Sequence, residues 1–146
     1  MSTPIAHLSR RYHFSASHRL HVDALSPEQN IATFGKCNNP FGHGHNYVVE
    51  VAFSGPVDPA TGMVTNLADL DSFAQRNLLD LFDHANLNTL PLFLDQVSTT
   101  ENLAVEVWRI FAEYPHATLR RVHIEETGNN SFDYFGNESA AVPAFM

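Results

Sequence analysis

Two histidines have the spacing of a metal site. His43 and His45 alternate with Gly42 and Gly44, and in an extended segment residues two positions apart lie about 6.6 Å from one another on the same side. Both imidazoles can therefore reach one ion. A His-x-His pair also occurs as ordinary polar side chains, so a third donor is needed to favour the metal site.

His18 offers that third donor. It ends an alternating segment on the side that carries Leu8 and Phe14, where an imidazole without a partner would be costly. Three neutral imidazoles with a fourth open position suit catalytic zinc. The alternative is that His18 is a hydrogen-bonded residue of the core.

Cys37 is the only cysteine, so no internal disulfide can form. It lies in a polar, glycine-containing stretch that leads to His43. A cation nearby would favour its thiolate, which could act as a base or a nucleophile. The alternative is a small buried side chain that only packs.

Three further residues could move protons or bind a ligand. Asp83 and His84 can form an acid–imidazole pair for proton transfer or a structural charge pair at the end of a helix. Glu126 shares a side with Val122 and Ile124, so its carboxylate needs a partner. That partner is either a ligand with two parallel N–H donors or an arginine nearby, Arg120 or Arg121.

Composition limits what the chain can bind. Eight Lys and Arg against sixteen Asp and Glu give a formal net charge of −8, which disfavours nucleic acid. The first eleven residues lack the apolar region of a signal peptide, and no run of about 18 apolar residues occurs. A length of 146 residues fits one domain. We expect a single cytoplasmic domain, residues 1–146, that binds neither nucleic acid nor membrane.

The elements that position these residues follow from periodicity. Residues 5–18 and 43–53 alternate as strands, and residues 25–44 carry Pro and Gly and are interpreted as a long loop. After turn chemistry at 54–62, residues 63–65 are expected to continue as a short extended piece.

The second half of the chain predicts two helices and two strands. Asn66 caps a helix whose apolar residues run from Leu67 to Leu81. A second helix is predicted to begin at Ser98, which forms a capping box with Glu101. Residues 119–127 and 132–135 are predicted strands joined by a turn. The order predicts an α+β fold, a four-stranded antiparallel sheet with two helices on one face, whose open edges favour oligomerisation.

Five segments in collinear order resemble the 6-pyruvoyltetrahydropterin synthase and 6-carboxytetrahydropterin synthase family. They are FSASHRL at 14–20, FGKCNNPFGHGHNY at 34–47, FDHANLN at 82–88, STTEN at 98–102 and ETGNN at 126–130. The resemblance implies His18, His43 and His45 as ligands of Zn2+ and Cys37 as the base. It also implies Asp83 and His84 as the partners of Cys37, and Glu126 with Thr99 and Thr100 as the pterin anchor.

The resemblance also implies an assembly and a reaction. Family members have the T-fold, close a twelve-stranded β-barrel as trimers and stack two trimers into a homohexamer, so that Asp83 and His84 would serve the Cys37 of a neighbour. The implied lyase reaction of tetrahydrobiopterin biosynthesis converts 7,8-dihydroneopterin triphosphate into 6-pyruvoyltetrahydropterin and triphosphate without an external redox cofactor.

Two other functions stay open. One is the sister activity, 6-carboxytetrahydropterin synthase of queuosine biosynthesis, although the separation of Cys37 from His43 resembles the pyruvoyl branch. The other is a pterin-binding barrel protein without catalysis. The residues that would bind the triphosphate are also open, because basic residues are scarce; the nearest are Arg10, Arg11, Arg19 and Lys36.

Overall fold

A long antiparallel strand pair forms the centre of the protein. The computed structural model describes residues 3–137. Strands β1 (Ile5–His18) and β2 (His43–Pro56) pair without interruption, from Ile5 opposite Pro56 to His18 opposite His43. The predicted bounds of the first strand are confirmed, and β2 runs beyond its predicted end at Phe53.

The sheet has five strands in the order β3-β1-β2-β4-β5. β4 (Thr118–Glu125) and β5 (Ser131–Tyr134) extend it antiparallel beside β2, as predicted. β3 (Ala85–Asn86) pairs parallel to β1, so the sheet is mixed and the four-stranded antiparallel prediction was wrong in that respect. Two residues are too few to show a period-two pattern in a sequence.

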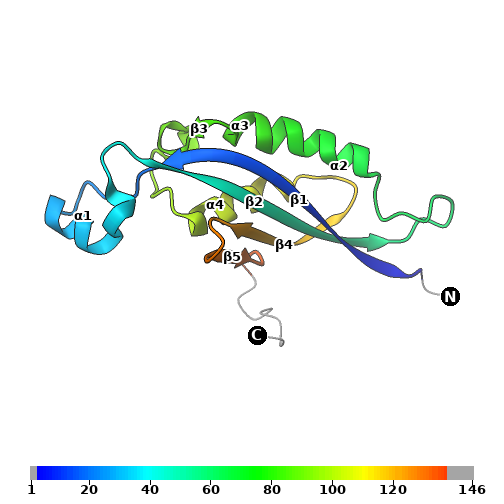
Figure 1. Ribbon diagram of the computed structural model, residues 1–146. Coiled ribbons are helices and arrows are strands. Elements are labelled where there is room, and N and C mark those ends of the chain that lie inside the picture. Colours follow the sequence, from blue (N-terminus) through cyan, green and yellow to red (C-terminus); the bar gives the residue numbers. More distant parts are fainter. Residues whose placement is uncertain (1–2, 138–146) are drawn as a thin grey trace.

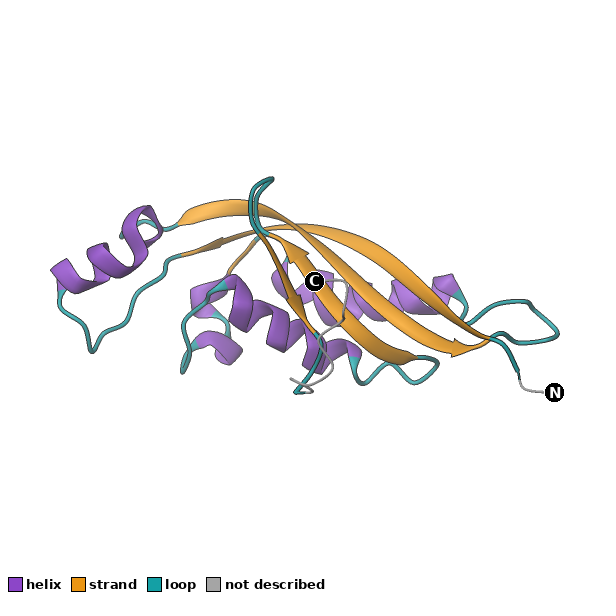
Figure 2. Cartoon of the chain, turned by 90° about the horizontal axis from the view of Figure 1, so that it is seen from below, coloured by secondary structure: helices purple, strands orange, loops and turns teal. Residues whose placement is uncertain are grey.

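Helices cover one face of this sheet, as predicted (Figure 2). α2 (Leu67–Ala74) continues through a π-helical turn, Gln75–Leu79, into α3 (Asp80–Phe82). α4 (Thr100–Phe111) lies on the same side and packs on β4 and β5. Short 3₁₀ turns, Leu87–Thr89 and Pro91–Phe93, connect the two helical segments. No helix within residues 3–137 has the length and apolar character needed to cross a bilayer.

A third helix lies inside the predicted loop. α1 (Pro27–Phe34) and a 3₁₀ turn, Gly35–Asn38, stand at the end of the molecule where β1 ends and β2 begins (Figure 1). Ser26 and Gln29 form a capping box, and Pro27 occupies the first turn, where its missing N–H is not needed. The prolines and glycines of this segment therefore start and end a helix and do not exclude one.

Two local predictions were wrong. Thr99, not Ser98, caps α4, because the Thr99 side chain accepts the Asn102 N–H while the Ser98 hydroxyl donates to the Arg19 carbonyl. Residues 63–65 form no strand, since the Met63 carbonyl accepts the Asp58 N–H within a turn.

The core lies between the helices and the sheet. It confirms the predicted alternation of apolar side chains along the first two strands. Phe14 stacks on Tyr47 and on Phe82 of α3, and Tyr12 stacks on Phe111 of α4. The odd-numbered residues of β2 from 47 to 53 are buried on this face, with at most 1% of their surface exposed. His18 lies on the same face of β1 as these rings.

Asp71 of α2 holds the helical layer to β1. Its carboxylate accepts two hydrogen bonds from the Arg10 guanidinium, at 3.0 and 2.8 Å, and one from the Tyr12 hydroxyl at 2.8 Å. These bonds, led by the one from Arg10, hold the pKa of Asp71 below its ordinary value of 3.8. Ionised Asp71 therefore stabilises the folded chain.

We predict that Asp71→Asn lowers the thermal midpoint by a few degrees at pH 7. Because the folded-state pKa is depressed, the stabilisation is present above about pH 4 and is lost as the pH falls through the folded-state pKa. The midpoints of the two proteins should thus converge in acid, as measured by calorimetry between pH 7 and pH 3. Glu113→Gln, at an exposed position outside the cluster, is the control. A gap that stays constant to pH 3 would contradict the electrostatic explanation.

Candidate metal centre and ligand cavity

The paired ends of β1 and β2 bring three imidazoles together. His18 is the direct cross-strand partner of His43, and His45 lies opposite Ala16, two positions along. One ring nitrogen from each histidine lies within 4.8 Å of the other two, and Nε2 of His18 is 3.2 Å from Nε2 of His43. These three residues could hold a metal ion, as the sequence predicted.

The backbone just before α4 fixes the orientation of the His18 ring. Its Nδ1 lies 2.7 Å from the Ser98 carbonyl oxygen, which can only accept a hydrogen bond. Nδ1 therefore carries the proton, and in the neutral ring Nε2 presents a lone pair toward His43. A metal-binding histidine commonly has this kind of outer partner. Sequence analysis missed this role of Ser98, because a backbone acceptor leaves no signal in the residue type.

The electrostatics of the cluster favour neutral imidazoles. Burial lowers the pKa of His18, of which only 1% is exposed, and His43 and His45 lower it further. Burial likewise lowers the pKa of His45, against the opposing effect of Glu126. Metal binding needs the neutral form of each ligand. Nδ1 of His43 and Nε2 of His45 are buried and have no hydrogen bond within residues 3–137, which fits a cluster of nitrogens arranged for a metal ion.

Glu126 lies beside this cluster, just after the end of β4. Its Oε1 is 3.3 Å from Nε2 of His45, and its Oε2 accepts a hydrogen bond from the Thr100 hydroxyl in the first turn of α4. The arginine alternative is wrong: Arg120 donates to Ser54, and Arg121 donates to Glu50 and Asp133. Glu126 keeps its carboxylate at the site.

Tyr47 contributes a buried hydroxyl next to the same residues. Its ring packs edge-on against His45, with 5.6 Å between centroids, and only 1% of its surface is exposed. Its hydroxyl has no hydrogen-bond partner within residues 3–137. Burial and the charge of Glu126 raise its pKa, so the hydroxyl stays protonated. The sequence did not single out Tyr47 as a residue of the site.

Cys37 reaches the site because the excursion between β1 and β2 closes on itself. The Leu20 N–H donates to the Cys37 carbonyl at 2.8 Å, and Asn38 Nδ2 donates to the Leu20 carbonyl at 2.7 Å. This closure returns Cys37 to the chain just after His18. The thiol is half-buried, and burial followed by the charge of Glu126 raises its pKa.

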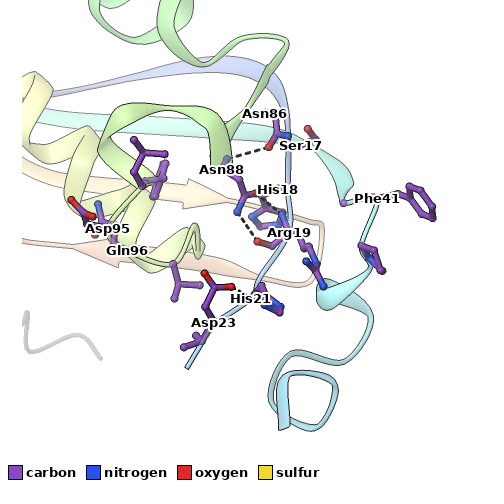
Figure 3. Close-up of a pocket in the computed structure, with 16 residues that line it drawn as sticks. Ser17, His18, Arg19, His21, Asp23, Phe41, Asn86, Asn88, Asp95 and Gln96 are labelled. Atoms are coloured by element: carbon purple, nitrogen blue, oxygen red, sulfur yellow. Dashed lines mark hydrogen bonds and ion pairs between the residues drawn. The ribbon is translucent and has the colours of Figure 1, made fainter. Parts of the chain in front are cut away.

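One cavity joins most of these side chains. It has a volume of about 970 Å³, within the range of ligand sites, and Cys37, His43, His45 and Glu126 all line it. A second cavity of about 550 Å³ lies beside the end of β1, where His18, Arg19 and Asn88 face it (Figure 3). The sequence-predicted metal ligands, thiol and carboxylate are therefore brought to one place.

Comparison with known proteins identifies the family. The family model described as 6-pyruvoyl tetrahydropterin synthase matches residues 7–137. The 6-pyruvoyl tetrahydrobiopterin synthase of Homo sapiens is 51% identical over 133 residues, which cover 90% of this chain and 92% of the human protein. The chain belongs to the 6-pyruvoyl tetrahydropterin synthase family.

Two further comparisons concern relatives with the pyruvoyl name and with the carboxy name. The structure of the Caenorhabditis elegans 6-pyruvoyl tetrahydropterin synthase matches with a TM-score of 0.88 at 44% identity, covering 93% of this chain and 99% of that one. A putative 6-carboxy-5,6,7,8-tetrahydropterin synthase of Archaeoglobus fulgidus is 32% identical over 103 residues, 70% of this chain and 82% of that protein. Sequence identity is thus higher on the pyruvoyl side.

The other predicted site residues, Asp83, His84 and Thr99, do not line the cavity that contains Cys37. Asp83 and His84 flank the edge of β1, where Asp83 Oδ1 accepts the Ser15 N–H and the His84 N–H donates to the Ser15 carbonyl. Thr99 caps α4, beside Thr100.

We predict that His43→Ala removes metal binding. The loss of affinity should exceed the roughly 10–100-fold that loss of an outer-shell partner costs, because a ligand is deleted. Elemental analysis after dialysis against Zn2+ should find about one ion per wild-type chain and almost none in the variant. His116→Ala, at an exposed position away from the cluster, should retain the ion. Equal metal content in both variants would exclude the three-histidine site.

Proposed function

We propose that this chain is a zinc-dependent 6-pyruvoyltetrahydropterin synthase that converts 7,8-dihydroneopterin triphosphate into 6-pyruvoyltetrahydropterin and triphosphate. The supporting observation is a cluster of three imidazoles beside a cavity that two of them, His43 and His45, line together with the thiol of Cys37 and the carboxylate of Glu126. The chain is also 51% identical to the human protein of that name. The activity is that of a carbon–oxygen lyase acting on phosphate, within one domain of residues 1–146. The cytoplasmic location expected from the sequence stays a prediction.

The donor set supports zinc as the metal. His18, His43 and His45 offer three imidazole nitrogens, which together with an open fourth position is the usual composition of a catalytic zinc site. A bound zinc ion would supply Lewis-acid stabilisation of negative charge on substrate oxygen. The hydrogen bond from His18 Nδ1 to the Ser98 carbonyl would hold the first of these ligands in its binding tautomer.

Glu126 is proposed to anchor the pterin ring. The amino group and ring N–H of a pterin form two parallel donors, which a carboxylate accepts in bidentate fashion. The hydrogen bond from Thr100 orients the carboxylate toward the cavity wall. Thr99, beside Thr100 at the start of α4, is proposed to support this anchor.

Cys37 is proposed as the base that removes a proton from the substrate side chain. Its Sγ would hold the proton while triphosphate leaves. Because the hydrogens only move within the substrate, the reaction needs no external redox cofactor. Burial and Glu126 raise the pKa of Cys37. The thiolate therefore needs a compensating positive charge in the loaded site.

Asp83 and His84 are proposed to complete a neighbouring subunit's site. Their imidazole and carboxylate lie 3.6 Å apart, and the His84 side chain is 85% exposed. His84 has φ 61°, a conformation that non-glycine residues rarely adopt and that often accompanies functional sites. Within one chain the pair lies outside the cavity of Cys37. A homohexamer, built as two trimers with closed barrels, would bring the two together.

One alternative is the carboxy-producing sister reaction. The chain is 32% identical to the putative archaeal protein of that name, against 51% for the human pyruvoyl relative. A pterin-binding barrel without catalysis is the other alternative. It has less support, because the histidine cluster, the thiol and the carboxylate lie together at the cavity.

Product analysis tests the proposal. The zinc-loaded protein incubated with 7,8-dihydroneopterin triphosphate should release triphosphate and a pyruvoyl product, identified by mass spectrometry. Cys37→Ala should lower turnover by at least about 100-fold, since general-base catalysis contributes roughly 10²–10⁴-fold, while zinc content stays at the wild-type level. A carboxy product would favour the sister reaction. Binding without turnover would favour the non-catalytic alternative, and full activity in Cys37→Ala would remove the thiol from the mechanism.

Mixing two inactive variants tests the shared site. Cys37→Ala and His84→Ala chains are each expected to be inactive alone. If His84 serves the Cys37 of a neighbour, hybrids formed by joint refolding contain some sites with both wild-type residues, and part of the activity returns. Mixing each variant with itself is the control. A mixture as inactive as its components would place Cys37 and His84 in the site of one chain, and full activity of His84→Ala alone would remove His84 from the mechanism.

A further inference from the structure

Half of the eight Lys and Arg side chains of this acidic protein have a carboxylate partner within the described residues. Arg10 pairs with Asp71, Arg11 with Glu50, Arg109 with Glu106, and Arg121 with Glu50 and Asp133. Arg120 donates to the Ser54 hydroxyl. Within residues 3–137, three cations have neither kind of partner: Arg19, Lys36 and Arg76. Two of these three, Arg19 and Lys36, line the cavity that contains Cys37 and Glu126.

Arg19 has a fixed backbone and a partly free guanidinium. The Asn88 side chain accepts the Arg19 N–H at 2.7 Å and donates to its carbonyl at 2.8 Å (Figure 3). The Arg19 Nε donates to the Asn38 carbonyl at 3.1 Å. The two terminal nitrogens have no hydrogen-bond partner within the described part of the chain. A half-buried guanidinium held in this way is arranged for an oxygen anion.

Lys36 belongs to the same wall of the cavity. It precedes Cys37 in the 3₁₀ turn that follows α1, and its side chain is exposed. Glu126 is the one carboxylate among the residues that line this cavity. Glu126 is hydrogen-bonded by Thr100 and lies beside His45, just after β4. The cavity therefore carries negative charge near the end of β4 and positive charge, from Arg19 and Lys36, along the segment between β1 and β2.

We propose that Arg19 and Lys36 form the anion subsite that binds the phosphate tail of the substrate, with the pterin ring at Glu126 and the three histidines between them. This inference rests on the proposed function for the identity of the ligand. It excludes two of the four basic residues that the sequence left open, because the guanidinium groups of Arg10 and Arg11 are already bound to Asp71 and Glu50. Elsewhere the net charge of −8 would repel a polyphosphate.

Calorimetric titration with inorganic tripolyphosphate tests the subsite in the zinc-loaded protein. Arg19→Gln and Lys36→Gln should each weaken binding about tenfold, the range expected for loss of hydrogen bonds to a charged group. Arg19→Lys keeps the charge but not the fork of donors, and should bind with intermediate affinity. Arg76→Gln removes an unpaired cation outside the cavity and should bind as the wild type does.

Each further outcome is decisive. Zinc content and thermal midpoint are measured for every variant, and Lys36→Gln, at an exposed position, keeps the test valid if Arg19→Gln fails to fold. Unchanged affinity in Lys36→Gln and Arg19→Lys would overturn the subsite. Binding that survives both but disappears in His43→Ala would place tripolyphosphate on the metal instead. If the protein binds tripolyphosphate through these cations yet does not turn over the pterin triphosphate, the proposed function fails and the anion subsite stands.

Discussion

The candidate site depends on the register of one strand pair. His18 and His43 meet because β1 and β2 pair without a bulge over fourteen residues each. Since side chains alternate between the two faces of a sheet, a shift of β2 by one residue would turn His43 and His45 to the opposite face. The same shift would expose the core residues of β2 from Tyr47 to Phe53. Burial of those large side chains therefore fixes the geometry of the imidazoles.

Burial of the imidazoles prepares them to bind a cation, but it also costs folding stability. Buried imidazoles with lowered pKa are ready to bind a cation as neutral donors. Within residues 3–137, however, Nδ1 of His43 and Nε2 of His45 have no hydrogen bond, and burying such nitrogens costs stability. The hydroxyl of Tyr47 is a third buried group at this place that has no hydrogen bond within the described part of the chain. The surrounding core of stacked rings, in which Phe14 contacts both Tyr47 and Phe82, supplies the stability that such a cluster requires.

Sequence patterns predicted the parts of the structure that repeat and missed those that depend on single contacts. Alternation gave β1 with its bounds and the burial of His18, because fourteen residues on a half-covered face repeat the pattern several times. β3 was missed because it has only two residues. The helix α1 was missed because Pro27 was interpreted as a sign of a loop, although proline is compatible with the first turn of a helix. The capping role fell to Thr99 because His18 and Arg19, distant in sequence, engage Ser98. The placement of Asp83 and His84 relative to Cys37 depends on assembly, which no pattern within one chain specifies.

The excursion between β1 and β2 explains how a rigid sheet acquires a chemically specific cavity. Residues 20 to 38 leave the sheet and return, and the bonds between Leu20 and both Cys37 and Asn38 close the segment beside the histidines. Asn30 stabilises it internally through bonds to Val22 and Leu25. Because both strands are anchored by the core, this segment can carry a thiol and a cation without disturbing the fold. The sheet thus supplies the metal ligands and, just after β4, Glu126, whereas the excursion supplies Cys37 and Lys36. The chemistry of the site can therefore change through the excursion alone while the imidazole cluster stays in place.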